Sequence, residues 1–178
     1  MGKDKKGGKK KPGKHTERPF EELPYRRGVG IALFNAAGKV FVAQRLDSPG
    51  PAWQMPQGGI DKGEMPLDAA WRELHEETGI TSAELLAESK AWLRYDLPEA
   101  LARKLWKGKY RGQEQKWYAF RFTGPESEID IDGEHPEFSA WRWVDFRQVP
   151  ELIVPFKRSL YQELVLEFGP LAHPVKVP

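Results

Sequence analysis

The sequence predicts an α/β fold, in which a mixed β-sheet is sandwiched between α-helices. Three observations predict it: strand-like and helix-like segments alternate along the chain, one helix carries clear start and stop signals, and 39% of the 178 residues are hydrophobic. This length is enough for one well-filled core and too short for two ordinary domains. We therefore expect a single domain over residues 20–178.

The strands are predicted from apolar segments that are bounded by turn-forming residues. The first two segments lie on either side of a turn over residues 35–39, so we expect a β-hairpin there. Three further strand segments follow the first helix. The predicted strands cover residues 25–34, 40–44, 89–95, 115–122 and 140–144.

Two helices are predicted from their ends and their periodicity. The first covers residues 66–78, because Pro66 suits the first turn of a helix and Gly79 is typical of a left-handed cap. The second covers residues 155–168, where apolar side chains recur at four-residue steps. Helices placed between strands in this order indicate that both faces of the sheet are covered.

The composition excludes several classes of function. Without cysteine, the chain has no disulfide framework, no thiolate nucleophile and no zinc–thiolate site. No segment approaches the roughly 18 apolar residues that cross a bilayer, and no apolar region follows the lysine-rich start. We therefore expect a cytoplasmic protein without membrane attachment, whose metal chemistry depends on carboxylates or histidines.

The first 18 residues carry much of the positive charge. They hold eight Lys or Arg and two acidic residues, a net charge of +6, in a chain whose net charge is +2. Because almost none of them is apolar, residues 1–19 are predicted to form a disordered basic tail. Two interpretations of this tail are open: a solubilising leader, or an electrostatic arm that holds polyanions nearby.

The first predicted helix carries the candidate chemistry. At about 100° per residue, Glu73, Glu76 and Glu77 fall within one arc of about 100°. Like charges at this spacing repel, and a hard divalent cation such as Mg²⁺ or Mn²⁺ removes that repulsion. An ordinary solvated acidic face is the alternative. A separate arc, expected to face the core, holds Leu67, Trp71, Leu74 and Thr78.

Residues at fixed spacing surround the three glutamates. Gly58 is followed after five residues by Glu64, and after seven more by Arg72-Glu73-Leu74-His75-Glu76-Glu77-Thr78-Gly79-Ile80. This pattern, with Gly59 beside its first glycine, resembles the signature of the Nudix hydrolase family. The resemblance implies the Nudix fold, a loop–helix–loop metal site, and hydrolysis of a nucleoside diphosphate linked to another group.

The resemblance extends to one subgroup, the bacterial RNA pyrophosphohydrolases and dinucleoside polyphosphate hydrolases. Segments similar to this subgroup cover residues 25–30, 53–60, 92–95, 112–117, 136–138 and 141–144. They imply an enzyme that removes pyrophosphate from the triphosphate 5′ end of RNA, leaves a 5′-monophosphate and so promotes RNA decay. Hydrolysis of molecules such as diadenosine tetraphosphate is the second expectation. A catalytically silent RNA- or nucleotide-binding module is a third, and the intact glutamate set argues against it.

The same resemblance implies roles for the acidic residues. It makes Glu73, Glu76, Glu77 and Glu137 the ligands of more than one Mg²⁺, with Mn²⁺ or another divalent cation as substitutes. Such ions lower the pKa of a bound water and stabilise charge on the leaving phosphate. Arg72 is expected to orient a glutamate of the motif by a bidentate ion pair. Glu64 is expected to fix the loop or to lie in the outer shell of ligands. One of the three helix glutamates is the preferred candidate for the general base.

On the substrate side, the resemblance places Arg26, Arg45, Gln113 and Lys157 near phosphates or the first nucleotides, and Phe156 against a base. Arg45 and Phe156 on opposite sides of a base would form a stacking clamp. The alternatives are core packing for Phe156 and plain surface charges for Arg26 and Arg45.

Two further groups of residues were weaker candidates. Lys107, Lys109 and Arg111 suggest a mobile basic loop that guides RNA, with a solvated loop as the alternative. His75 and His135 are expected to be surface histidines, although His135 lies close in sequence to Glu137. Protein partners are not predicted.

Overall fold

The fold is built on one mixed β-sheet, described in a computed structural model over residues 17–48 and 50–176. The strands are β1 (Tyr25–Phe34), β2 (Val40–Arg45), β3 (Gln57–Gly59), β4 (Ala83–Glu88), β5 (Leu93–Asp96), β6 (Gly112–Phe122) and β7 (Phe138–Val144). Their order is β4-β6-β1-β2-β7, while β3 pairs with β1 and β5 pairs with β6. The two long central strands, β1 and β6, run parallel along their whole length.

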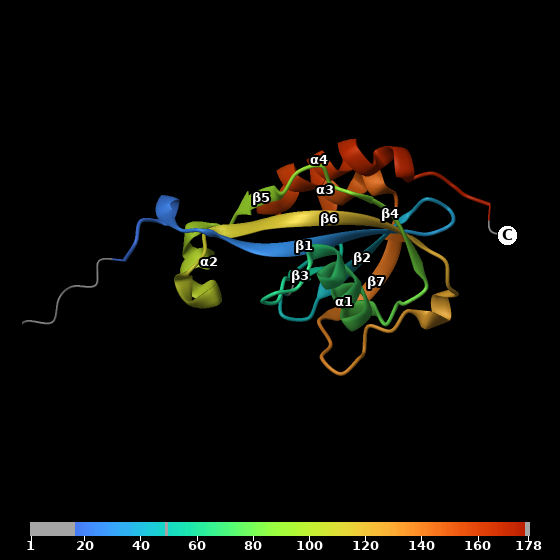
Figure 1. Ribbon diagram of the computed structural model, residues 1–178, viewed down its shortest axis with the longest axis horizontal. Helices are drawn as coiled ribbons and strands as arrows, with labels where there is room; N and C mark the ends of the chain where they lie inside the picture. Colours follow the sequence, from blue (N-terminus) through green and yellow to red (C-terminus); the bar gives the residue numbers. More distant parts are fainter. Residues whose placement is uncertain (1–16, 49, 177–178) are drawn as a thin grey trace, which may run out of the picture.

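Helices cover both faces of the sheet, as the sequence predicts (Figure 1). The α-helices are α1 (Pro66–Thr78), α2 (Glu99–Lys104), α3 (Val149–Leu152) and α4 (Arg158–Phe168). In Figure 1, α3 and α4 lie above the sheet and α1 lies below it, while α2 hangs beside one end of β1 and β6. No helix in the described part of the chain is long and apolar enough to span a membrane.

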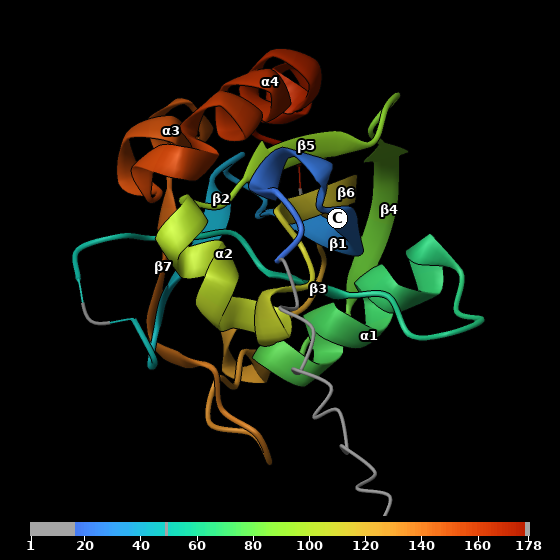
Figure 2. The same ribbon diagram turned by 90° about the vertical axis from the view of Figure 1, so that its left-hand side faces the viewer.

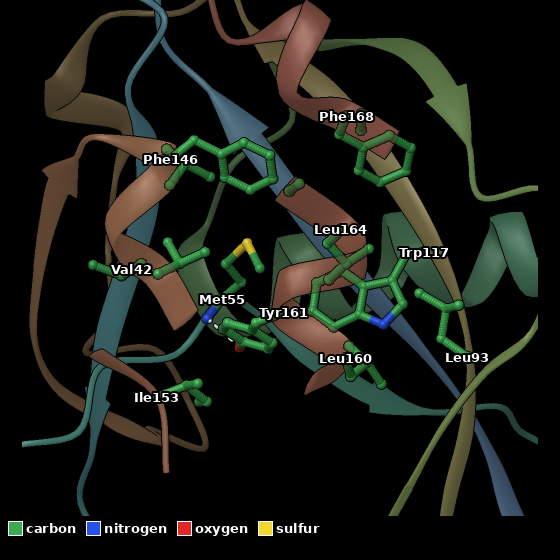
Figure 3. Packing of buried hydrophobic residues seen from close by; sticks show 14 of the residues in the cluster. Val42, Met55, Leu93, Trp117, Phe146, Ile153, Leu160, Tyr161, Leu164 and Phe168 are labelled. Atoms are coloured by element: carbon green, nitrogen blue, oxygen red, sulfur yellow. Dashed lines mark hydrogen bonds between the residues drawn. The ribbon is translucent and has the colours of Figure 1, made fainter. Parts of the chain in front are cut away.

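Two apolar cores lie on opposite faces of the sheet. The core beneath α3 and α4 includes Trp117, Tyr161 and Phe146, and Figure 3 shows these side chains among the other buried residues of this core. The Tyr161 hydroxyl accepts a hydrogen bond of 2.9 Å from the backbone N–H of Met55, so the core also fixes the segment before β3. The ring of Trp117 fills the space beside Gly30, where an added Cβ would lie 2.2 Å from the ring. The second core, beneath α1, includes Leu74, Phe41 and Phe120.

The predicted strand over residues 89–95 is only partly right, because residues 93–95 lie in β5 and residues 89–92 lie in no strand. The structure has two shorter strands, β4 and β5, which pair with different parts of β6. Between them Ser89 is buried, donates from its hydroxyl to the carbonyl of Ala91 and accepts from the N–H of Trp117. These local bonds take the backbone out of strand geometry at the point where the sequence pattern looked continuous.

Other predicted elements agree closely, and a few were missed. The first helix has the predicted bounds, with Pro66 at its first turn and Gly79 left-handed at its end (φ 70°). The last helix has the predicted extent, since a 3₁₀ turn over Pro155–Lys157 leads into α4. The sequence missed β3, which has three residues, and α2, which has six. Elements this short leave too few residues to show a period.

The N-terminal boundary is described only in part. Residues 17–19 are extended and exposed, and a 3₁₀ turn begins at Phe20. The carbonyl of Arg18 accepts a hydrogen bond from Arg103 at 3.1 Å, so part of the predicted tail contacts the domain. The prediction of disorder for residues 1–16 lies outside the described residues.

Candidate active site

Helix α1 places its glutamates against the glycine-containing strand β3. A Cβ added to Gly58 would lie 1.9 Å from the carboxyl carbon of Glu73, so only glycine leaves room for that carboxylate. Glu73 and Glu77 are 9% and 5% exposed, whereas the side chain of Glu76 is 57% exposed. The alternative of a solvated acidic face therefore describes Glu76 and not the other two.

The arc predicted to face the core is only half right. Leu74 and Thr78 are fully buried, but Leu67 and Trp71 are only half-buried and pack on the rim of the core. The helix is buried over a wider arc than its apolar residues indicate, because the two buried glutamates lie against β3 and the loop before β7.

Arg72 organises the loop that precedes the helix. Its Nε and Nη2 donate to the two carboxylate oxygens of Glu64, each at 2.8 Å, which is the predicted bidentate pair with Glu64 as the partner. Nη2 also donates to the carbonyl of Gly59 at 2.9 Å. The ion pair lowers the pKa of Glu64 to about 2, and Glu64 in turn accepts from the backbone N–H of Asp61. Glu64 therefore holds the loop.

The same guanidinium also binds two of the candidate ligands. Its Nη1 donates to Glu73 at 2.9 Å and to Glu76 at 3.2 Å. Burial nevertheless raises the pKa of Glu73 to about 7, against the lowering effect of Arg72. As these side chains lie, no three acidic or histidine residues in the described ranges converge on one point.

Glu77 is the least satisfied group of the site. Both of its carboxylate oxygens are buried and have no hydrogen-bond partner among the described residues. Burial raises its pKa well above the ordinary value, and the nearby carboxyl of Glu137 raises it further. Glu137 comes from the loop before β7, as the sequence predicts for the fourth carboxylate, and its carbonyl accepts from the N–H of Leu46 at 2.9 Å.

A pocket of about 480 Å³ opens beside this carboxylate pair. Glu76, Glu77 and Glu137 line it together with His75 and His135. Both histidines are exposed, as the sequence predicts, and His135 shares the pocket with Glu137. Three of the four candidate carboxylates and both imidazoles thus gather around one hollow, which Glu73 does not line, and oxygen donors predominate among them. We refer to Glu73, Glu76, Glu77 and Glu137 as the carboxylate site.

A second pocket, of about 350 Å³, collects most of the predicted substrate-binding residues. Arg45, Gln113, Phe156 and Lys157 all line it, from three segments far apart in the sequence. We call it the base pocket. It adjoins the carboxylate site, because the negative charge of Glu77 is close enough to raise the pKa values of both Lys157 and Arg45.

Lys157 is the buried cation of the base pocket. It is 6% exposed, its Nζ donates to the side chain of Gln57 at 3.2 Å, and it lies 5.0 Å from the ring centroid of Tyr95. Burial and the neighbouring charge of Arg45 lower the pKa of Lys157 to about 7. Phe156 is half-buried, with its ring 6.0 Å from that of Tyr95. It is therefore neither a core residue nor a fully exposed platform.

The two predicted arginines differ in their surroundings. Arg45 makes two 2.7 Å hydrogen bonds to Asp47, so it is a paired cation at the pocket rim. Arg26 stacks on Trp106, which itself lines the base pocket, at 5.3 Å from the ring centroid. A Cβ on Gly59 would lie 2.4 Å from the Arg26 guanidinium. Arg26 therefore reaches from the base pocket to the loop of the carboxylate site.

Sequence reasoning missed a chain of buried amides beneath the base pocket. Trp117 donates from its indole to Gln115, which donates to Gln113 at 2.7 Å and to Gln57 at 3.0 Å. Gln57 also accepts from Lys157, so the chain links the core to the cation of the pocket. Tyr95 and Trp106 were missed as pocket residues as well. The alternation of Gln113, Gln115 and Trp117 along one strand face was the available signal.

The prediction of a free basic loop over residues 107–111 is wrong for Arg111. That side chain makes hydrogen bonds of 2.7 and 3.1 Å to Asp96 and another to the carbonyl of Glu21. Just before it, Trp106 and Lys107 have left-handed backbones (φ 47° and 58°). Non-glycine residues adopt this conformation rarely and at a cost, and such strain tends to persist at functional sites.

Comparison with known proteins identifies the family. A NUDIX domain matches residues 24–164, which is most of the chain. This chain belongs to the Nudix family. A curated relative from Rhodospirillum rubrum, named RNA pyrophosphohydrolase, is 60% identical over 85% of this chain and 92% of its own length.

Solved Nudix structures share the fold at much lower identity. The dihydroneopterin triphosphate pyrophosphohydrolase of E. coli is 19% identical, with a TM-score of 0.61 over 80% of this chain and 98% of that one. An Ap4A hydrolase of C. elegans, in a binary complex, is also 19% identical, with a TM-score of 0.60 over 82% of this chain and 98% of that one. The expected family and fold are thereby confirmed.

Proposed function

We propose that this protein is an RNA pyrophosphohydrolase, which hydrolyses the triphosphate 5′ end of RNA to a 5′-monophosphate and pyrophosphate. The observation that carries the proposal is the buried carboxylate of Glu77, unpaired beside Glu137 and adjacent to a pocket with a buried cation. The name of the R. rubrum relative supports the RNA substrate. A 5′-monophosphate end promotes RNA decay, and because RNA turns over in the cytoplasm of bacteria, the proposal places the protein there.

The carboxylate site fits a divalent cation. An unpaired buried carboxylate is costly, and a hard cation with oxygen ligands removes that cost. Glu73, Glu76, Glu77 and Glu137 would hold more than one Mg²⁺, or Mn²⁺ in its place. Such ions lower the pKa of a bound water and neutralise charge on the leaving phosphate. Members of the Nudix family typically use divalent cations, which agrees with this donor set.

The remaining residues of the site bind and orient. Arg72 fixes Glu64 and Glu73, so the loop and the first carboxylate keep their positions without substrate. Arg26, Arg45 and Lys157 supply positive charge on the side of the base pocket, where a polyphosphate chain needs it. Phe156 offers a half-exposed ring against which a base stacks. One of Glu73, Glu76 and Glu77 accepts the proton of the attacking water.

Dinucleoside polyphosphates are the competing substrates, because they also present a nucleoside beside a phosphate chain. The test compares kcat/KM for a triphosphate-ended RNA of eight nucleotides with kcat/KM for diadenosine tetraphosphate, at the same Mg²⁺ concentration. We expect the RNA to be the better substrate, with pyrophosphate as the released product. A higher value for diadenosine tetraphosphate would reverse the assignment.

A silent binding module is tested in the same experiment. If neither substrate is hydrolysed in Mg²⁺ or Mn²⁺, while the RNA still binds, the enzyme proposal fails and the binding alternative stands. Glu84→Gln provides the matched control, because Glu84 is an exposed glutamate on β4 and lies in neither pocket. Its activity should equal that of the wild type.

A further inference from the structure

Arginine and aromatic side chains alternate across one end of the sheet. The Arg27 guanidinium lies 4.8 Å from the ring centroid of Trp92, and that of Arg94 lies 4.7 Å from Tyr25. The Arg111 guanidinium also lies close to the Tyr25 ring, 5.1 Å from its centroid. Arg111 also contacts the ring of Phe20. We call this set the arginine ladder; it consists of Phe20, Tyr25, Arg27, Trp92, Arg94 and Arg111.

Strand register places Tyr25, Arg27 and Arg94 of the ladder on one face of β1 and β5. Arg27 pairs with Glu114, and Glu114 pairs with Arg94, so these three form one row across the strands. The neighbouring row, Arg26, Gln113 and Tyr95, points to the other face, where Gln113 and Tyr95 line the base pocket. Figure 2 looks along the molecule from the end at which these strands begin or end.

Two arginines of the ladder, Arg27 and Arg94, are held by one carboxylate and remain open to solvent. Glu114 accepts from Arg27 at 3.0 Å and from Arg94 at 3.1 Å. The side chain of Glu114 is 14% exposed, whereas those of Arg27 and Arg94 are 66% and 60% exposed. One carboxylate and two aromatic rings thus fix two planar cations that present most of their surface to solvent.

The ladder is continuous with the base pocket around the edge of β5. A hollow of about 370 Å³ at this edge is lined by Tyr25, Arg94 and Asp96 of the ladder side, and by Tyr95, Phe156 and Leu160 on the other. Tyr95 and Phe156 also line the base pocket. A nucleic-acid strand that extends beyond Phe156 therefore reaches Arg94 and Tyr25 next, and then Arg27 and Trp92.

We propose that the arginine ladder binds the nucleotides of single-stranded RNA that follow those held in the base pocket. Bases stack on guanidinium planes and aromatic rings, and phosphates pair with the exposed guanidinium N–H groups. The ladder holds three arginines against Glu114 and Asp96, so its net charge favours a polyanion. The proposal rests on the proposed function and deepens it. The ladder binds the downstream nucleotides of RNA, and a dinucleoside polyphosphate has no such nucleotides.

The test separates RNA length from chemistry. The double variant Arg27→Ala/Arg94→Ala is compared with wild type on triphosphate RNAs of two and eight nucleotides and on diadenosine tetraphosphate, at low salt. We expect kcat/KM to fall about tenfold for the eight-nucleotide RNA, through KM, with little change for the other two substrates. An equal loss on all three, or none on the longer RNA, would overturn the proposal.

A second double variant controls for effects on folding, and a binding measurement controls for effects on catalysis. Arg27→Lys/Arg94→Lys retains both charges beside Glu114 but removes the planar guanidinium faces. This variant should have the melting temperature of wild type, but it should bind the eight-nucleotide RNA more weakly than wild type does. Binding is measured by fluorescence anisotropy with an eight-nucleotide RNA that carries a 5′-hydroxyl. Unchanged affinity in both double variants would show that the ladder only stiffens the sheet.

The control variant is Arg147→Ala. Arg147 is another exposed, ion-paired arginine, with 83% of its side chain accessible, and it follows β7, outside both substrate pockets. It should bind and hydrolyse every RNA as wild type does. If wild type binds the RNA through the ladder but hydrolyses none of it, the ladder stands and the proposed function fails, so the two proposals remain distinguishable.

Discussion

Two buried charges of opposite sign lie in adjoining parts of the molecule, and the protein treats them differently. Lys157 has a hydrogen-bond acceptor in Gln57 and an aromatic ring in Tyr95. Glu77, which is about equally buried, has no partner for either oxygen among the described residues. The cation of the base pocket is therefore satisfied by the protein itself, whereas the buried carboxylate is not, which agrees with the divalent cation that we propose for the carboxylate site.

The largest expected effect comes from the loss of a carboxylate from the carboxylate site. Glu77→Gln should lower kcat for RNA by about 100-fold or more, because it removes a ligand that nothing else in the site replaces. Its melting temperature in EDTA should equal or exceed that of wild type, since the amide needs no counter-charge. Near-normal turnover at saturating Mg²⁺, with Glu84→Gln measured alongside, would contradict the assignment.

The next effect tests the base pocket. Phe156→Ala should lower kcat/KM for RNA by a factor that corresponds to about 1 to 3 kcal/mol of lost binding, which is the range for loss of a stacked base. A core phenylalanine costs about 3 to 5 kcal/mol in stability when truncated, and the half-buried ring of Phe156 should cost less. Chemical denaturation and steady-state kinetics on the same preparation separate the two. A core-sized loss of stability with unaltered kcat/KM would make Phe156 a packing residue.

The pH dependence of stability sharpens the comparison. In the folded, metal-free protein the pKa values of Glu77 and Glu73 lie above those of an unfolded chain, with Glu73 at about 7. Each then contributes stability below about pH 4.5 that is lost as the pH rises through its folded pKa. In EDTA, wild type should melt at a lower temperature at pH 8 than at pH 5, and Glu77→Gln should decline less. Parallel declines in the two proteins would show that Glu77 is not involved.

The smallest effect concerns the strained turn beside the base pocket. Trp106→Ala should raise KM for RNA about two- to fivefold, because a cation–π contact to Arg26 is worth about 0.5 to 1 kcal/mol. Trp106→Phe should recover most of this loss. In an Arg26→Ala background, Trp106→Ala should not raise KM further. A full additional increase in KM there would show that Trp106 does not act through Arg26. Lys107→Gly, which relieves the left-handed backbone, serves as the control for strain.

The two regions also differ in how far the sequence predicts them. Helical spacing alone places Glu73, Glu76 and Glu77 on one face of a helix. Gly58 and Glu64 entered through the family signature, and Glu137 entered only through the family resemblance. Its position depends on β7, and no local pattern reveals that distance.

The base pocket draws on several segments that are distant in the sequence, and here prediction was less complete. Arg45, Gln113, Phe156 and Lys157 were expected there and lie there. Gln57, Tyr95 and Trp106 were missed, because a short strand, an edge strand and a strained turn carry no periodic signal. The roles of all these residues remain predictions, whereas their proximity is a property of the fold. The same reasoning explains why the first half of the strand predicted over residues 89–95 was wrong: the bonds of Ser89 are visible only in three dimensions.

The parallel pairing of β1 with β6 has a consequence for folding kinetics. The partners Arg27 and Glu114 are 87 residues apart, and the row that faces the base pocket forms in the same register. Contacts this distant in sequence are slow to form, because a long loop must close before they contribute. Helix α1, by contrast, needs only local contacts. We therefore expect refolding to regain helical signal first and RNA binding last, in the slowest phase that stopped-flow mixing detects.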